Sequence, residues 1–175
     1  MKATYLLEAQ HRKIESLFRR LEERGSDPQV ALEELANSLA AHMAVEQDIF
    51  YPAVQRLVRG LVNESYEEHA LVEVALKRLL TTAPEEDPFP ARLAALKLLT
   101  LHHVKEEEQE LFLQVEALLD NAALEQLGQS LQVRFDEVFA SGFEAALPQG
   151  WARTSADIAK TAVDQKGKPS SRSVA

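Results

Sequence analysis

Residues 39–51 read LAAHMAVEQDIFY, and residues 100–112 read TLHHVKEEEQELF. In each stretch a histidine precedes a glutamate by four residues, His42 with Glu46 and His103 with Glu107, and large apolar residues follow. Side chains four residues apart lie on the same face of an α-helix. Each pair can therefore offer one nitrogen and one carboxylate oxygen to a metal. Two such pairs predict two facing helices of one metal-binding bundle.

The sequence around these stretches predicts an all-α fold. Apolar residues recur in steps of three and four, which is typical of amphipathic helices. This spacing predicts that the inward stripe continues after Glu46 through Ile49, Ala53 and Leu57, and after Glu107 through Leu111 (or Glu110), Gln114 and Leu118. Asp27-Pro28 and Asp87-Pro88 are typical helix starts, Asn63 is a candidate N-cap, and Pro52 predicts a bend inside a helix. We expect an up-down-up-down four-helix bundle with an additional C-terminal helix. The expected helices cover residues 4–24, 28–59, 63–80, 88–119 and 122–146.

Length and composition limit the domain organisation and the class of protein. The 175 residues fit one domain, expected at residues 1–148, followed by a polar, disordered tail at residues 149–175. The net charge of -9 argues against a surface that binds nucleic acid. Cysteine is absent, so disulfides and thiolate metal sites are excluded. A signal peptide and a membrane-spanning apolar run are not found, so we expect a soluble, cytoplasmic protein without a membrane partner.

The histidines have an unusual distribution. Each of the four expected bundle helices has one on its inward stripe, and His102 falls off that stripe. A single inward histidine is most often a core residue that hydrogen-bonds a carboxylate. Four of them together with two inward glutamates, and no Lys or Arg on the stripes, point to a metal instead, because a buried carboxylate needs a compensating charge. The expected metal ligands are His11, His42, Glu46, His69, His103 and Glu107.

The donor set also indicates which metal to expect. Four imidazole nitrogens and two bridging carboxylates supply about eight donor atoms to two ions that each prefer about six. We expect two iron ions joined by an oxo or hydroxo bridge, with about two open positions, and manganese or zinc as possible substitutes.

These residues resemble the hemerythrin-like, or HHE cation-binding, domain family. The family pattern is a histidine on the first helix, His-x-x-x-Glu on the second, Glu-His on the third and His-x-x-x-Glu on the fourth. Here it is matched by His11, His42-Met-Ala-Val-Glu46, Glu68-His69 and His103-Val-Lys-Glu-Glu107, over about residues 5–120. The resemblance implies a non-haem di-iron site whose partner is a small diatomic molecule, O2 or NO.

Two positions depart from the oxygen-carrying hemerythrins, which have a second histidine one turn after the third-helix histidine and an aspartate in the last motif. Glu73 stands at the position of that histidine, and Glu107 stands at the position of that aspartate. Glu73 is therefore a further candidate ligand, and so is Glu15, which lies one turn after His11. A carboxylate-rich set of ligands favours ferric iron and should weaken reversible oxygen carriage. We therefore expect a protein that responds to oxygen, nitric oxide or redox state, or that handles iron.

Two alternatives remain open at this point. The first is a di-iron oxidase or a nitric oxide or peroxide reductase, and the second is an interaction bundle with a structural metal. Tyr5, Tyr51 and Tyr66 could lie near the site or serve only as core packing. The sequence does not identify the protein partner or the oligomeric state.

Overall fold

The computed structural model describes residues 1–23 and 27–147, and within them the regular secondary structure is entirely helical. The expected tail at residues 149–175 and the expected domain boundary at residue 148 lie outside this range. The helices are α1 (Ala3–Glu22), α2 (Pro28–Val45), α3 (Tyr51–Val54), α4 (Arg59–Leu80), α5 (Pro88–Glu106), α6 (Phe112–Leu118), α7 (Asn121–Ser141) and α8 (Phe143–Ala146), with π-helical turns η1 (Glu46–Phe50) and η2 (Glu107–Leu111).

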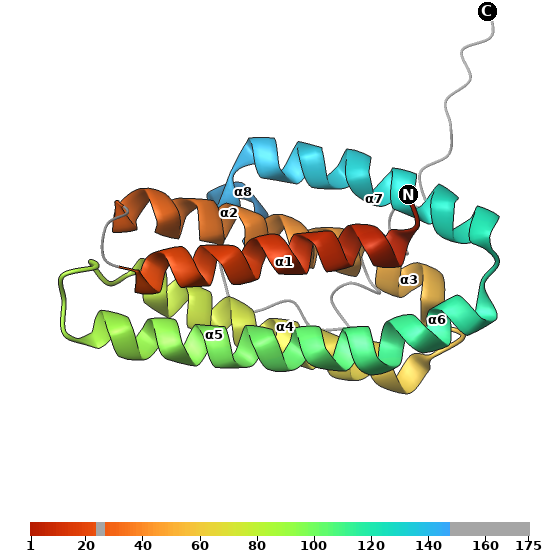
Figure 1. Ribbon diagram of the computed structural model, residues 1–175, viewed down its shortest axis with the longest axis horizontal. Coiled ribbons are helices and arrows are strands. Elements are labelled where there is room, and N and C mark those ends of the chain that lie inside the picture. The colour runs from red at the N-terminus through yellow and green to blue at the C-terminus, as the bar shows by residue number, and fades with distance from the viewer. Residues whose placement is uncertain (24–26, 148–175) are drawn as a thin grey trace, which may run out of the picture.

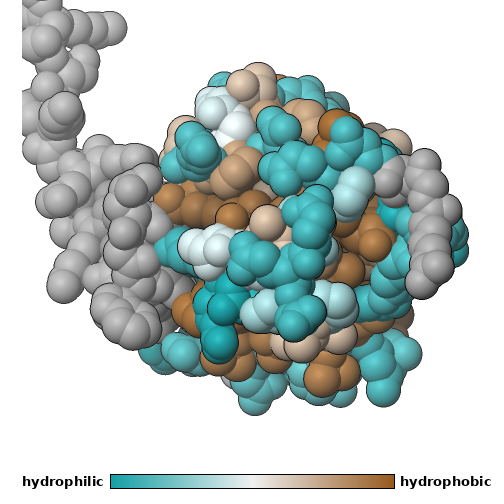
Figure 2. Space-filling model, turned by 90° about the vertical axis from the view of Figure 1, so that its left-hand side faces the viewer, coloured by the Kyte–Doolittle hydropathy of each residue, from teal (hydrophilic) through white to brown (hydrophobic). Residues whose placement is uncertain are grey.

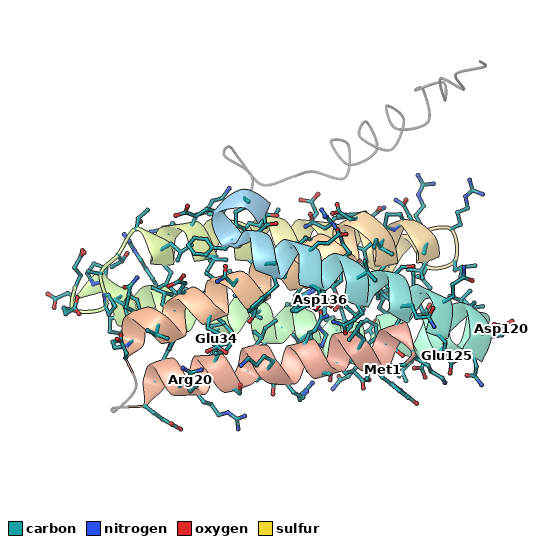
Figure 3. The ribbon with its side chains drawn as sticks, turned by 90° about the horizontal axis from the view of Figure 1, so that it is seen from above. Met1, Arg20, Glu34, Asp120, Glu125 and Asp136 are labelled. Atoms are coloured by element: carbon teal, nitrogen blue, oxygen red, sulfur yellow. The ribbon has the colours of Figure 1, made fainter. Side chains whose placement is uncertain are left out.

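The architecture is the expected four-helix bundle with a further helix on its outside (Figure 1). α1 packs against α2, and α4 packs against α5, with α2–η1–α3 and α5–η2–α6 forming the two long members of the bundle. α7 runs along α1 and α2, as the view from above also shows (Figure 3). The all-α fold class predicted from the sequence is confirmed.

The two π-helical turns occupy equivalent places in the two long helices. Each begins at the glutamate of a His-x-x-x-Glu motif, and the amide of Tyr51 or Phe112 donates to the carbonyl of Glu46 or Glu107, five residues earlier. Such a turn inserts one extra residue into the α-helix, so the side chains of all later residues are rotated about the helix axis. Since η2 contains no proline, Pro52 is not needed to explain η1.

Because of this rotation, the prediction of the inward stripe is partly wrong beyond the two glutamates. After Glu46 the stripe was expected to continue through Ile49, Ala53 and Leu57, but Ala53 and Leu57 are exposed and Ile49 is only partly buried. After Glu107, Leu111 is buried as expected, whereas Gln114 and Leu118 are exposed. The residues buried in their place are Phe50, Tyr51, Val54, Val58, Phe112 and Val115.

Several helix boundaries also differ from the prediction. The helix expected to reach residue 59 ends at Val54, and the next begins at Arg59, so Asn63 lies inside α4 and does not cap it. A turn at residues 55–58 separates the two, anchored by the buried Val58. Asp27 does cap α2 by accepting from the amides of residues 29 and 30, but Asp87 makes no equivalent hydrogen bond.

The interior consists of two apolar clusters at opposite ends of the bundle. One joins the C-terminal half of α1 to the N-terminal halves of α2 and α5 through residues such as Phe18, Leu35 and Leu96. The other joins the start of α1 to α3, α6 and α7 through Leu7, Phe50 and others. Most of the buried charged side chains belong to the level of the bundle between these two clusters.

The helix α7 is held on the bundle by a close backbone contact and by polar links. At Gly128 a Cβ atom would lie 2.3 Å from the carbonyl oxygen of Met1, so the side chain must be absent for the helices to approach this closely. Arg134 pairs with Asp48 of η1 at 2.9 Å, and the side chain of Asn37 accepts from the amide of Phe143 at 2.7 Å.

Surface properties complete the description of the fold. Figure 2 shows the end of the bundle that carries the α4–α5 loop, where hydrophilic residues predominate at the rim and apolar residues are visible between them. Across residues 1–23 and 27–147, every helix is too short or too polar to traverse a bilayer.

Candidate metal centre

The six side chains predicted as metal ligands meet in the centre of the bundle. Their ligand atoms form two groups in which all members lie within 4.8 Å of one another. The first group is His11, His42, Glu46 and Glu107, and the second is Glu46, His69 and His103. All six side chains are at most 3% exposed. Each of the four bundle members contributes one histidine, as the sequence predicted.

The histidines form two close pairs. The Nε2 atoms of His11 and His42 are 3.1 Å apart, and those of His69 and His103 are 2.9 Å apart. Two nitrogens about 2.1 Å from one ion lie about 3.0 Å apart at a right angle and about 3.4 Å apart at a tetrahedral angle. The observed separations are short enough for each pair of histidines to hold one ion.

Each glutamate reaches both histidine pairs. Glu46 Oε2 lies 3.2 Å from the Nε2 atoms of both His42 and His69. Glu107 Oε2 lies 3.3 Å from His11 Nε2 and 3.6 Å from His103 Nε2. A carboxylate between two pairs of imidazoles can bridge two ions, as glutamates from bundle helices do in di-metal proteins.

The hydrogen bonding of these carboxylates is incomplete. Neither oxygen of Glu46 has a hydrogen-bond partner, and neither has Oε2 of Glu107, although both side chains are almost completely buried. A buried carboxylate oxygen without a donor costs several kcal/mol, and a bound cation removes that cost. The unpartnered oxygens, together with the facing nitrogens, fit a metal centre.

Hydrogen bonds on the outer side of two rings determine which nitrogen can bind a metal. His11 Nδ1 lies 2.8 Å from Glu108 Oε1, and His103 Nδ1 lies 2.8 Å from Glu68 Oε2. An ionised carboxylate only accepts, so Nδ1 carries the proton in both rings. A metal binds the neutral form of a ring, and in that form the Nε2 atom of each of these histidines presents a lone pair towards the centre.

The ionisation of the central groups is strongly unequal. Burial and the charge of Glu107 raise the pKa of Glu46 well above its usual value. Burial acts on Glu107 in the same direction, but the charges of His103 and His11 outweigh it and hold the pKa of Glu107 well below its usual value. Burial also lowers the pKa values of His42 and His69 well below that of a free imidazole. Without a cation between them, the two glutamates cannot both ionise easily.

Tyr51 also belongs to the centre. Its hydroxyl donates to Glu107 Oε1 at 2.9 Å and lies 3.1 Å from His69 Nε2, and burial raises the pKa of the phenol well above its usual value. From the sequence alone, Tyr51 is no stronger a candidate than Tyr5 or Tyr66. Tyr5 is half exposed, whereas the ring of Tyr66 packs against that of Tyr51 at 5.1 Å, away from the ligand atoms.

The other candidate residues lie outside the two central groups. Glu15 is bound to Arg12 at the surface at 2.8 Å. Glu73 is buried one turn after His69, but its carboxylate belongs to neither group of converging ligand atoms. His102 is 61% exposed and forms a separate surface group with Glu68 and Glu106, in agreement with its predicted place off the inward stripe.

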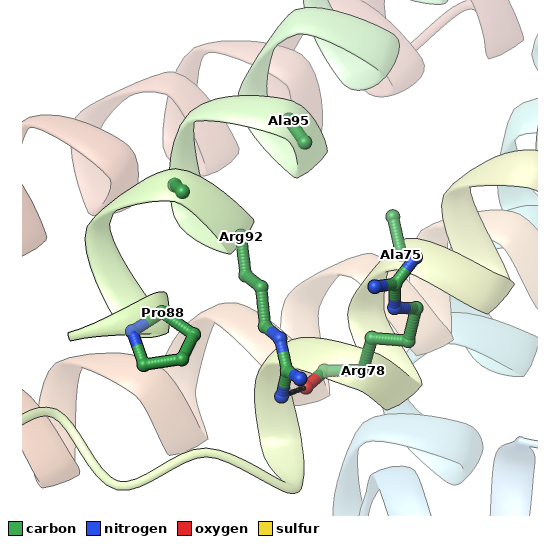
Figure 4. Close-up of a pocket in the computed structure, with 6 residues that line it drawn as sticks. Ala75, Arg78, Pro88, Arg92 and Ala95 are labelled. Atoms are coloured by element: carbon green, nitrogen blue, oxygen red, sulfur yellow. Dashed lines mark hydrogen bonds between the residues drawn. The ribbon is translucent and has the colours of Figure 1, made fainter. Parts of the chain in front are cut away.

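Two surface pockets lie between the helices, and only one of these two borders a residue that contacts the centre. The larger, about 330 Å³, lies between α4 and α5 near the end of the bundle, and Ala75, Arg78, Pro88, Ala91, Arg92 and Ala95 line it (Figure 4). A smaller one, about 210 Å³, lies between α1, α2 and α7. Gln10 lines this smaller cavity and its Oε1 atom lies 3.0 Å from His42 Nδ1, so one side chain separates the cavity from the centre.

Two known proteins are similar to this chain. A protein from Nostoc sp. strain PCC 7120 named a DNA nickase is 28% identical over 120 residues, which are 66% of this chain but only 34% of that protein. A crystal structure of a hemerythrin HHE cation binding domain-containing protein from Mycobacterium kansasii superposes with a TM-score of 0.74 over 92% of this chain and 99% of that one, at 24% identity. At that identity the likeness supports the fold alone.

The family comparison covers the helices that carry all six central residues. The hemerythrin HHE cation binding domain matches residues 2–115, from the start of α1 to the middle of α6. The additional helix α7 lies beyond the matched range. The chain belongs to the hemerythrin HHE cation-binding domain family.

Proposed function

We propose that the chain binds two iron ions between the two histidine pairs and uses them to respond to a small oxidant, O2 or NO, or to redox state. The ligands would be His11 and His42 for one ion and His69 and His103 for the other. The observation that carries the proposal is the position of Glu46, which is fully buried, has two unpartnered oxygens and lies 3.2 Å from one histidine of each pair.

Iron suits this donor set best. Mixed imidazole and carboxylate ligands in octahedral geometry are typical of non-haem iron, and they also accept manganese or zinc. The two histidine pairs and two bridging carboxylates leave positions at each ion for a small external molecule. The protein residues hold the ions, bridge them and exclude bulk water, because two apolar clusters close the centre at both ends.

Sensing or iron handling is favoured over bulk oxygen carriage. Both carboxylates bring negative charge to the centre, and anionic oxygen ligands stabilise ferric iron relative to ferrous iron. The metals would supply the electron transfer, and the protein would set how readily it occurs.

A second candidate function is catalytic turnover, as a di-iron oxidase or a nitric oxide or peroxide reductase. Tyr51 favours it, because its hydroxyl lies at hydrogen-bond distance from both Glu107 and His69 and can donate a hydrogen bond within the centre. Steady consumption of the oxidant in the presence of a reductant would distinguish turnover from binding.

The test is anaerobic loading with ferrous iron, followed by absorption spectroscopy while O2 or NO is added and then removed. Binding of about two irons per chain and a spectral change on exposure are expected. A change that reverses on removal supports reversible binding, whereas a permanent change supports redox sensing or oxidase chemistry. Uptake of fewer than two irons per chain would overturn the proposal.

A further inference from the structure

Four side chains outside the proposed ligand set connect the four members of the bundle in a closed ring. Each of the four is the immediate sequence neighbour of a proposed ligand, and each contacts Nδ1 of the histidine on another member. The members of this ring are Gln10, Gln47, Glu68 and Glu108.

The contacts run in chain order around the bundle. Gln10, on α1, lies 3.0 Å from His42 of α2, and Gln47, on η1, lies 3.0 Å from His69 of α4. Glu68, on α4, lies 2.8 Å from His103 of α5.

Glu108 closes the ring. It lies on η2, in the last member of the bundle, and its carboxylate is 2.8 Å from His11 of α1, in the first. Every central histidine is therefore held by a residue that adjoins a proposed ligand on a different bundle member.

The ring contains two carboxylates and two amides, and their distribution is regular. Of the pair His11 and His42, the first is backed by Glu108 and the second by Gln10. Of the pair His69 and His103, the first is backed by Gln47 and the second by Glu68. Each proposed ion therefore receives one carboxylate-backed imidazole and one amide-backed imidazole.

The two kinds of backing have different chemical effects. A carboxylate polarises the Nδ1–H bond more strongly than a neutral amide oxygen does, which makes Nε2 a better electron donor to a metal. Gln47 contacts His69 through Nε2 of its amide, and a flip of that amide would present Oε1, the acceptor that leaves Nε2 of His69 available.

We infer that Gln10, Gln47, Glu68 and Glu108 are positioning residues that orient the four histidines and set the reduction potential of the centre through the balance of two carboxylates and two amides. This inference rests on the proposed function, since it concerns the same two ions. The residues act through the imidazoles and do not themselves bind metal.

The experiment is a redox titration of the iron-loaded full chain, followed by absorption, with the iron content measured in parallel. Glu108→Gln should shift the midpoint potential to a more positive value, because ferric iron loses donation from His11. Gln10→Glu should shift it to a more negative value. The double variant with both changes keeps one carboxylate on that pair, so its potential should return close to the wild-type value.

Iron content provides the second measurement. Saturated single variants should still hold about two irons per chain, with metal affinity weakened by about 10–100-fold in Glu108→Gln. The same cycle at the other pair, Glu68→Gln with Gln47→Glu, gives an independent measurement. Glu34→Gln is the matched control, because Glu34 pairs with Lys13 and Arg20 on the surface and touches no central histidine (Figure 3).

The outcomes separate this inference from the proposed function. Potentials that do not move, or that move in the same direction for Glu108→Gln and Gln10→Glu, would overturn the ring as a determinant of potential. Equal loss of iron in all four single variants would show that the ring only packs the site. A wild-type chain that does not take up two irons would instead overturn the proposed function.

Discussion

The α1–α2 half and the α4–α5 half of the bundle supply similar side chains to the centre but surround them differently. Each half provides one histidine pair, and Glu46 and Glu107 reach across to both. α7 packs mainly on the α1–α2 half, whereas the hydroxyl of Tyr51 contacts His69 of the other half. Similar ligands in different surroundings should give two ions that are not equivalent in exchange or in reactivity.

The largest effect is expected from removing a histidine of either half. His42→Ala should reduce the iron content from about two per chain to one or fewer, and so should His103→Ala, because each takes one donor from a different pair. Metal analysis after anaerobic loading measures this. The matched control is His102→Ala, since His102 is 61% exposed and lies beside His103 in the sequence. An equal loss at His102 would contradict the assignment of the inward histidine.

The next effect concerns the pH dependence of metal binding. Burial and the charge of Glu107 raise the pKa of Glu46 well above 4.5, so above pH 4.5 the metal-free protein retains a proton that a bridging metal must displace. Apparent metal affinity should therefore rise with pH, by up to about tenfold per unit for each proton released, until the raised pKa is passed. Calorimetry in buffers of different ionisation enthalpy counts the protons. If no proton is released when metal binds, a role for Glu46 in both halves is contradicted.

Tyr51→Phe tests the α4–α5 half, which the hydroxyl of Tyr51 contacts from α3. Glu107 loses its hydroxyl donor, so the metal-free protein should lose about 1.5–3 kcal/mol of unfolding free energy in urea titrations. Tyr66→Phe is the control, because its hydroxyl makes only a long contact of 3.4 Å with a backbone carbonyl and the loss should be about 1 kcal/mol or less. If the two variants lose the same free energy, the bond from Tyr51 to Glu107 contributes nothing particular to that half.

Gly128→Ala tests the half that α7 covers. The new methyl group would meet the backbone of residues 1–3, so the variant should lose about 1–3 kcal/mol while retaining its iron. Relative to the wild-type protein, the rate of amide hydrogen exchange should increase more in α1, α2 and α7 than in α4 and α5. Gly60→Ala is the control, since a Cβ there meets nothing within 4 Å and should be neutral or slightly stabilising. Uniform loosening of all helices would contradict a local role for α7.

Sequence periodicity was sufficient to predict the bundle, the fifth helix and the six converging side chains. Four of these residues lie at or before Glu46 and Glu107 on the two long members, and the histidines at 11 and 69 lie on α1 and α4, so regular α-helical spacing holds for all six. Just beyond them the π-helical turns shift the register by one residue, which is why Ala53 and Leu57 were wrongly expected to be buried. A helical period of 3.6 contains no signal for an inserted residue.

The supporting residues were missed for a different reason. Gln10, Gln47 and Glu108 are polar neighbours of inward residues, and polar residues at helix edges usually face solvent. Only the crossing of neighbouring helices brings them to another helix's histidine. The one signal for them in the sequence is that each is adjacent to a proposed ligand. Glu68 has the same signal, because it precedes His69 in the Glu-His motif.

The division of the interior into two apolar clusters affects how the protein unfolds. The two clusters share no buried residue, and the layer between them contains buried carboxylate oxygens without a hydrogen-bond partner. In the absence of metal, the two ends of the bundle should open as separate cooperative units. With metal bound, one set of coordination bonds joins all four bundle members, and unfolding should become a single transition whose midpoint depends on metal concentration.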